Sequence, residues 1–92
     1  MVTADDFRKW MMEPEADDRE VEAVLGAARM YLAGAGVPRL LDNEEKDMAI
    51  LQLAGYWWES RGPGQSGEYP APPPSVRSMI LHLRYPDEEA MP

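Results

Sequence analysis

The sequence predicts an all-α protein, a small bundle of about four helices with a long Gly/Pro-rich loop before the last helix. Apolar residues recur at spacings of three and four in four segments of the chain. Residues that favour helix starts precede these segments, and glycine or proline follows most of them. No stretch alternates apolar and polar residues over the length of a reliable strand.

The chain has 92 residues, enough for one domain. We expect this domain to span residues 1–92, with an ordered core at about 3–85 and an acidic tail at 86–92. Without cysteine, stability has to come from helix packing or from neighbouring subunits. The start lacks the basic and apolar regions of a secretory signal, and the most apolar stretch is too short to cross a bilayer. We therefore expect a soluble protein, made in the cytoplasm, without membrane contact.

The net charge of −8 bears on possible partners. The chain has 17 acidic and nine basic residues, and the basic ones form no stripe. This argues against a protein that binds nucleic acid by releasing counterions from phosphates. Two interpretations of the acidity stay open: it provides only solubility, or it forms a surface that repels DNA or attracts a basic partner.

The first predicted helix begins after Thr3, a suitable N-cap, and ends before Pro14. Three residues share its apolar face: Phe7, Trp10 and Met11. The second predicted helix has Asp17 or Asp18 as its cap and ends near Gly36. Its apolar positions fit a 3.6-residue period: Val21, Val24, Leu25, Ala28, Tyr31, Leu32 and Ala35.

The third predicted helix follows a connector whose Leu40 and Leu41 we expect in the core. It starts at Asp42, where Asp42-x-x-Glu45 resembles a capping box, and runs to about residue 61. Between residues 48 and 58 it is apolar nearly all round, as expected for a helix that is covered on every side. Three short helices would struggle to cover it. It is therefore either the central core helix, or partly covered by another copy or a partner, or both.

The loop at 62–74 has three glycines and five prolines, so it is neither helix nor central strand. We interpret its proline half as a stiff arm, anchored by Tyr69, that presents the last helix; the alternative is a disordered spacer. Ser75 is the expected cap of a last helix at 76–84. The apolar face of that helix is formed by Val76, Met79, Ile80 and Leu83.

No residue pattern indicates catalysis, a metal or a cofactor. The single histidine, His82, has no second histidine with which to share zinc. The glycines at 62, 64 and 67 follow a helix instead of a strand, so they do not form a dinucleotide site. The pair Trp57-Trp58 could stack on bases, but without neighbouring basic residues packing explains it better. We expect a protein that is not an enzyme and needs no cofactor.

Four segments together resemble a known family. They read Thr3-x-x-Asp-Phe-x-x-Trp-Met, then Val21-x-x-Val-Leu-x-Ala-Ala-Arg-x-Tyr-Leu, then Met48-Ala-Ile-Leu-Gln-Leu-Ala-Gly-Tyr-Trp-Trp-Glu-Ser-Arg61, and finally Pro74-Ser-Val-Arg-Ser-Met-Ile-Leu-His-Leu-Arg-Tyr85. This pattern resembles the head–tail connector (neck adaptor) proteins of long-tailed bacteriophages and prophages. The resemblance covers about residues 3–85. The connector between the second and third segments is shorter here than in many members, and an acidic tail replaces a basic and apolar end.

The resemblance implies a helical bundle that forms a homo-oligomeric ring, twelve-fold in the virion. The ring would lie in the neck of the virion between the portal protein and the tail-side completion protein, assembled in the bacterial cytoplasm. DNA would pass through its lumen without specific binding, and no enzyme activity or cofactor is implied.

The candidate interface residues are Arg29, Tyr56, Trp57, Trp58, Arg61, Tyr69 and Arg77. We expect the three aromatic residues at 56–58 to pack in the core and between subunits, and Arg29 and Arg61 to meet acids of the next subunit. The loop and the last helix, with Arg77, are candidates for portal or neighbour contact. The alternative function is a small acidic helical regulator that binds a protein, of the anti-repressor or antitoxin type.

Overall fold

The computed structural model describes residues 1–60 and 70–84 and contains four α-helices there. Helix α1 spans Ala4–Met11, α2 Asp18–Gly34, α3 Glu44–Ser60 and α4 Pro74–Arg84. No strand occurs within these described residues, and the predicted all-α bundle is confirmed. Most of the predicted loop, residues 62–69, and the predicted tail at 86–92 lie outside the described residues.

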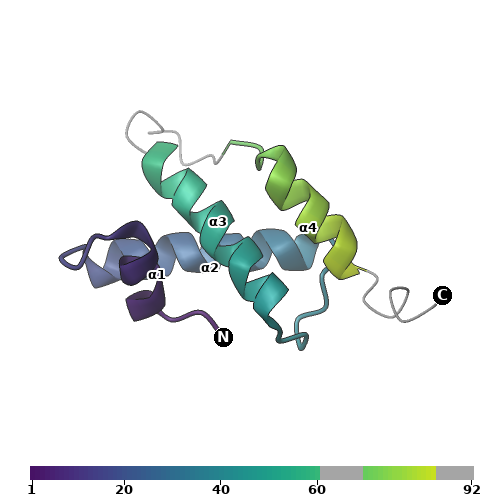
Figure 1. Ribbon diagram of the computed structural model, residues 1–92, viewed down its shortest axis with the longest axis horizontal. Helices are drawn as coiled ribbons and strands as arrows, with labels where there is room; N and C mark the ends of the chain where they lie inside the picture. Colours follow the sequence, from purple (N-terminus) through teal and green to yellow (C-terminus); the bar gives the residue numbers. More distant parts are fainter. Residues whose placement is uncertain (61–69, 85–92) are drawn as a thin grey trace.

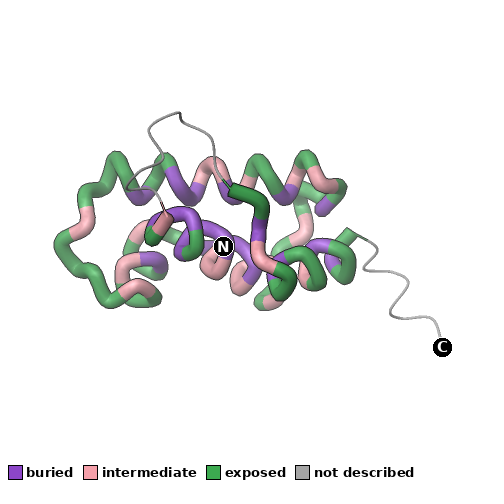
Figure 2. The backbone as a smooth tube through the Cα atoms, turned by 90° about the horizontal axis from the view of Figure 1, so that it is seen from above, coloured by how far each residue is buried: buried purple, intermediate pink, exposed green. Residues whose placement is uncertain are grey.

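Helix α3 is the centre of the bundle. It crosses α2, and α1 and α4 lie on either side of it (Figure 1). The buried residues are concentrated where the helices face one another, and the outer sides of the helices are exposed (Figure 2).

The predicted starts of the first two helices are confirmed. The Thr3 hydroxyl accepts a hydrogen bond from the backbone N–H of Asp6 at 3.2 Å, and the Asp6 carboxylate accepts one from the backbone N–H of Thr3 at 3.0 Å. This reciprocal pair satisfies two donors that a helix start leaves free. In α2 the cap is Asp17, whose carboxylate accepts from the backbone N–H of Arg19.

The predicted starts of the last two helices were wrong in detail. Helix α3 begins at Glu44, and the side chain of Asn43, instead of that of Asp42, accepts from the backbone N–H of Lys46 at 2.7 Å. Helix α4 begins at Pro74, a residue that suits the first helical position because its missing N–H would be unpaired there. Ser75 therefore lies inside the helix and is not its cap.

Helix α2 ends at Gly34, two residues before the predicted stop at Gly36, which has φ of 103°. Glycine adopts such a positive φ without the strain that a Cβ would add. The expectation that Leu40 is in the core was wrong: its side chain is 97% exposed. Val37 is buried in its place, because the chain turns inward directly after Gly36.

The core is shared among all four helices and is centred on α3. The expectation that three short helices would struggle to cover α3 was wrong, since seven of its residues are buried. They are Ala49, Ile50, Leu53, Ala54, Gly55, Trp57 and Trp58. Gly55 explains part of this coverage: a Cβ built there would lie 3.0 Å from the Met11 sulfur, so α1 crosses α3 closely at this glycine.

We expect Leu53→Ala to lower the free energy of unfolding by about 2–5 kcal/mol, because Leu53 is fully buried and its truncation leaves a cavity. The matched control is Leu81→Ala on α4, where the leucine is exposed and the expected change is within about 0.5 kcal/mol. Urea unfolding monitored by tryptophan fluorescence measures both. Equal effects of the two substitutions would contradict the described core.

The capping box predicts an acid-sensitive contribution to stability. Two hydrogen bonds lower the pKa of the Asp6 carboxyl. The larger effect comes from the backbone N–H of Thr3 and the smaller from the Thr3 hydroxyl. Because the folded-state pKa is lowered, this contribution is present above the ordinary carboxyl pKa and is lost as the pH falls through the folded value. Asp6→Asn should therefore lower the free energy of unfolding at pH 7. Below about pH 4 the difference in this free energy between the variant and wild type should become smaller. Urea unfolding at both pH values tests this, with Glu22→Gln, an exposed position of α2, as the control for the loss of one negative charge.

Candidate functional site

The sequence-predicted interface residues do not form one cluster. Arg61 and Tyr69 lie outside the described residues. Arg29 is on α2, the three aromatic residues at 56–58 are on α3, and Arg77 is on α4. Of the three aromatic residues at 56–58, only Tyr56 is exposed, on the outer side of α3.

Trp57 and Trp58 are core residues, 2% and 6% exposed. The Trp58 ring packs edge-on against Phe7 with centroids 5.4 Å apart, and its Nε1 donates to the Glu13 carboxylate at 3.1 Å. The Trp57 Nε1 donates to the Pro70 carbonyl at 2.8 Å. The two indoles therefore join α3 to the segment after α1 and to the segment before α4. This burial leaves little of either ring for a nucleic-acid base or for another subunit.

The segment before α4 is folded against its own chain. Pro72 is buried, and its carbonyl accepts from the Arg77 Nε at 3.4 Å. The Ser75 hydroxyl lies 3.5 Å from the Gln52 amide oxygen of α3. Residues 70–84 thus cover α3, and the arm that we expected to present the last helix holds it on this bundle instead.

A histidine–carboxylate pair also joins α4 to α3. The Nδ1 of His82 lies 2.6 Å from a carboxylate oxygen of Glu45, and the two become an ion pair when the imidazole is protonated. This pairing was not predicted, because the two residues are 37 positions apart and only the packing of α4 on α3 brings them together.

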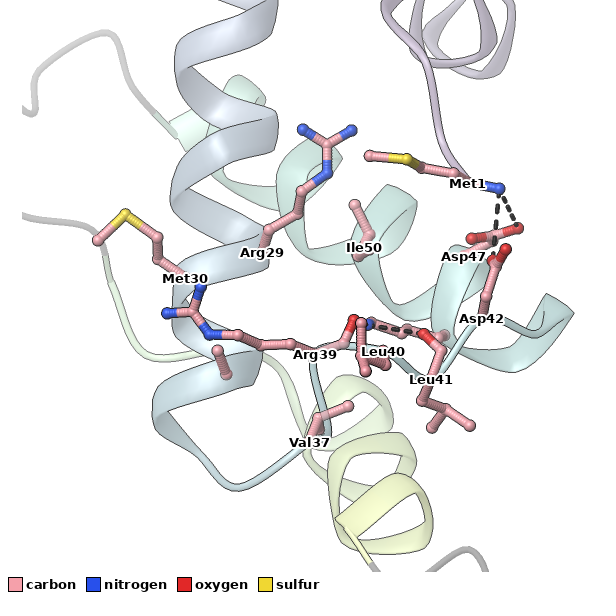
Figure 3. A pocket seen from close by; sticks show the side chains of 12 residues that line it. Met1, Arg29, Met30, Val37, Arg39, Leu40, Leu41, Asp42, Asp47 and Ile50 are labelled. Atoms are coloured by element: carbon pink, nitrogen blue, oxygen red, sulfur yellow. Dashed lines mark hydrogen bonds and ion pairs between the residues drawn. The ribbon is translucent and has the colours of Figure 1, made fainter.

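A hollow with an apolar lining lies beside Arg29. We call it the Arg29 pocket: a cavity of about 380 Å³ between the last turns of α2, the connector at 37–42 and the start of α3 (Figure 3). Its apolar lining is formed by Met1, Met30, Ala33, Val37, Leu40, Leu41 and Ile50. Three of these side chains are exposed at its rim, namely those of Met1, Met30 and Leu40. The pocket therefore offers apolar surface to a partner.

Lys46 fixes the shape of the connector that forms one wall of the Arg29 pocket. Its Nζ donates to three backbone carbonyls, those of Pro38 at 3.1 Å, Arg39 at 3.0 Å and Leu41 at 2.8 Å. The backbone N–H of Leu41 also donates to the Pro38 carbonyl. These bonds fix the connector on both sides of Leu40, whose side chain is exposed. A surface fixed in this way loses little conformational entropy when it binds.

The charged lining of the Arg29 pocket is more basic than the chain as a whole. Arg29, Arg39 and Lys46 contribute three cationic side chains against the two carboxylates of Asp42 and Asp47. The amino group of Met1 pairs with both carboxylates, at 3.4 and 3.7 Å. The Arg29 Nη2 donates to the Val2 carbonyl at 2.5 Å, whereas its buried Nε–H has no hydrogen-bond partner. In a chain of net charge −8, this lining suits an acidic partner.

The end of α1 is a second place with exposed apolar residues. Met12 is 85% exposed and has φ of 58°, the only positive φ of a non-glycine residue within the described residues. Helix ends with this geometry usually use glycine or asparagine, and a Cβ there costs about 1 kcal/mol. We call residues 12–16 the Met12 turn. The sequence analysis expected the first helix to end before Pro14 and did not predict the positive φ of Met12, because no glycine or asparagine marks this helix end.

The Met12 turn is fixed by contacts from both sides. The Arg8 Nε donates to the Ala16 carbonyl at 3.1 Å, and the Arg8 guanidinium also pairs with Asp18 and with Asp5. On the other side the Trp58 Nε1 holds the Glu13 carboxylate. Met12 therefore projects from a turn whose position relative to the core is defined.

Within residues 1–60 and 70–84, no group of three or more histidine, aspartate or glutamate side chains is arranged to hold a metal ion. Over the same ranges, none of the helices combines the length and the apolar character needed to cross a membrane.

Comparisons with protein-family models, with curated proteins and with solved structures found no match to this chain.

We expect Lys46→Met to loosen the connector at 37–42, because three carbonyls lose their donor. The loss in stability should be on the order of 1 kcal/mol, and the Leu41 amide should exchange its hydrogen faster. The matched control is Lys9→Met, on the exposed side of α1. Hydrogen exchange followed by NMR reports the connector directly. Unchanged protection of Leu41 would contradict the role assigned to Lys46.

Proposed function

We propose that this protein is a non-enzymatic assembly subunit of the head–tail connector type, forming a homo-oligomeric ring in the neck of a phage virion. The ring lies between the portal protein and the tail-side completion protein, and DNA passes through its lumen. The resemblance over residues 3–85 supports the class of protein, and the small all-α bundle is compatible with it.

The observation that carries the proposal is the placement of exposed apolar side chains on a bundle whose core is already filled. Eight large apolar residues are exposed among the described residues, and five of them lie at two places. Trp10 and Met12 lie at the end of α1, and Met1, Met30 and Leu40 lie around the Arg29 pocket. Apolar surface at two separate places favours a protein that contacts more than one neighbour, as a ring subunit does.

The acidity of the chain supports the passage of DNA. With a net charge of −8, the average surface potential repels a polyanion and disfavours adhesion of DNA to a channel wall. A protein that grips DNA needs the opposite charge.

The proposal is tested by electron microscopy and sedimentation of the purified chain, alone and mixed with the portal protein encoded in the same genome. We expect the chain to sediment with the portal and to add a ring with an open centre to it. A portal protein from an unrelated phage is the control and should not retain the chain. A chain that ignores both portals and stays a monomer or dimer would contradict the proposal and would favour the regulator.

A further inference from the structure

The Met12 turn and the Arg29 pocket are complementary in shape and charge. The Met12 turn presents a projecting apolar side chain, and the Arg29 pocket is a hollow with an apolar lining. Residues 12–18 contain four acids and no basic residue, whereas the pocket lining has an excess of cationic side chains. Contacts of this kind combine apolar burial with charges that orient the partner.

One protomer cannot make this contact with itself. The Met12 turn precedes α2, and Arg29, Met30 and Ala33 of the pocket lie in the last turns of that helix. Helix α2 has 17 residues, so its two ends are about 25 Å apart. Figure 1 shows the turn after α1 at one end of the long axis and the connector after α2 toward the other end. A partner of the Met12 turn is therefore another molecule.

We infer that the Met12 turn of one copy docks into the Arg29 pocket of the next, and that this head-to-tail contact joins the copies of this protein. Two different surfaces meet in such a contact, so an open assembly always keeps one free turn at one end and one free pocket at the other, and addition continues until a ring closes. The inference deepens the proposed function, and it rests on that proposal in taking copies of the chain to assemble with one another.

The strained backbone of Met12 supports a binding role for its side chain. A glycine at this position would remove the strain and would leave the fold unaffected, because the Met12 side chain is 85% exposed. A strained, exposed and well-fixed residue is typical of a functional position. Both surfaces are also fixed before they meet, one by Arg8 and Trp58 and the other by Lys46. Docking of two rigid surfaces avoids the entropy loss of ordering them.

Two single substitutions separate the contact from the fold. Met12→Gly removes the projecting side chain and relieves the positive φ, so the variant should be at least as stable as wild type. Leu40→Glu places an acid on the exposed rim of the pocket, where it repels the acidic turn. The matched control for the second is Leu81→Glu, at an exposed leucine of α4. Met12→Leu keeps an apolar side chain in the turn and serves as the rescue of the first.

Analytical ultracentrifugation measures the association of the wild-type chain and of each variant. We expect wild type to form species larger than a dimer, and Met12→Gly and Leu40→Glu each to associate at least about tenfold more weakly. Leu81→Glu and Met12→Leu should behave as wild type. An equimolar mixture of Met12→Gly and Leu40→Glu retains one intact turn and one intact pocket, so it should form heterodimers and nothing larger.

Three results would overturn the inference: unchanged association of both variants, a wild-type chain that stops at a dimer, or a wild-type chain that is monomeric at millimolar concentration. Circular dichroism of the variants shows that they are folded. These results leave the proposed function to be judged by binding of the wild-type chain to the portal. If the chain binds the portal but shows one of these three results, the proposed function stands and only the head-to-tail contact is refuted.

Discussion

A central helix that is apolar on most of its surface has to be covered before a chain of 92 residues can fold. Here α2 crosses α3, and α1 and α4 close its sides, so that Trp57 and Trp58 are both buried. The indole nitrogens then extend the coverage outward, because their hydrogen bonds to the Pro70 carbonyl and the Glu13 carboxylate fix the neighbouring segments. The Met12 turn and the start of α4 owe their positions to these bonds.

Coverage of α3 also decides where the protein can interact. Because the core is complete within one chain, self-association does not need α3. Five of the eight exposed large apolar side chains among the described residues lie at the end of α1 and around the Arg29 pocket. Both places are held by a cation that binds backbone carbonyls: Arg8 at the Met12 turn and Lys46 at the connector. In the proposed assembly the contacts are therefore made by the Met12 turn and the Arg29 pocket and not by the two tryptophans.

The four helices and two of their caps, Thr3 and Asp17, followed from local signals in the sequence, namely apolar spacing and helix-start residues. The coverage of α3 did not, because it depends on how closely α1 crosses at Gly55 and how α4 folds back, which are tertiary features. Leu40 illustrates the same limit: its apolar character favoured the core, yet its side chain is exposed in a connector that Lys46 binds through three carbonyls. Of the candidate interface residues, Arg29 lines the pocket, whereas Trp57 and Trp58 belong to the core.

Urea unfolding of the Met12→Gly variant at several protein concentrations, followed by tryptophan fluorescence, shows whether α3 is covered within a single chain. We expect one cooperative transition whose midpoint does not depend on concentration, because no partner takes part in folding. A midpoint that rises steadily with concentration, together with a chain that is unfolded when dilute, would show instead that α3 needs another molecule to cover it.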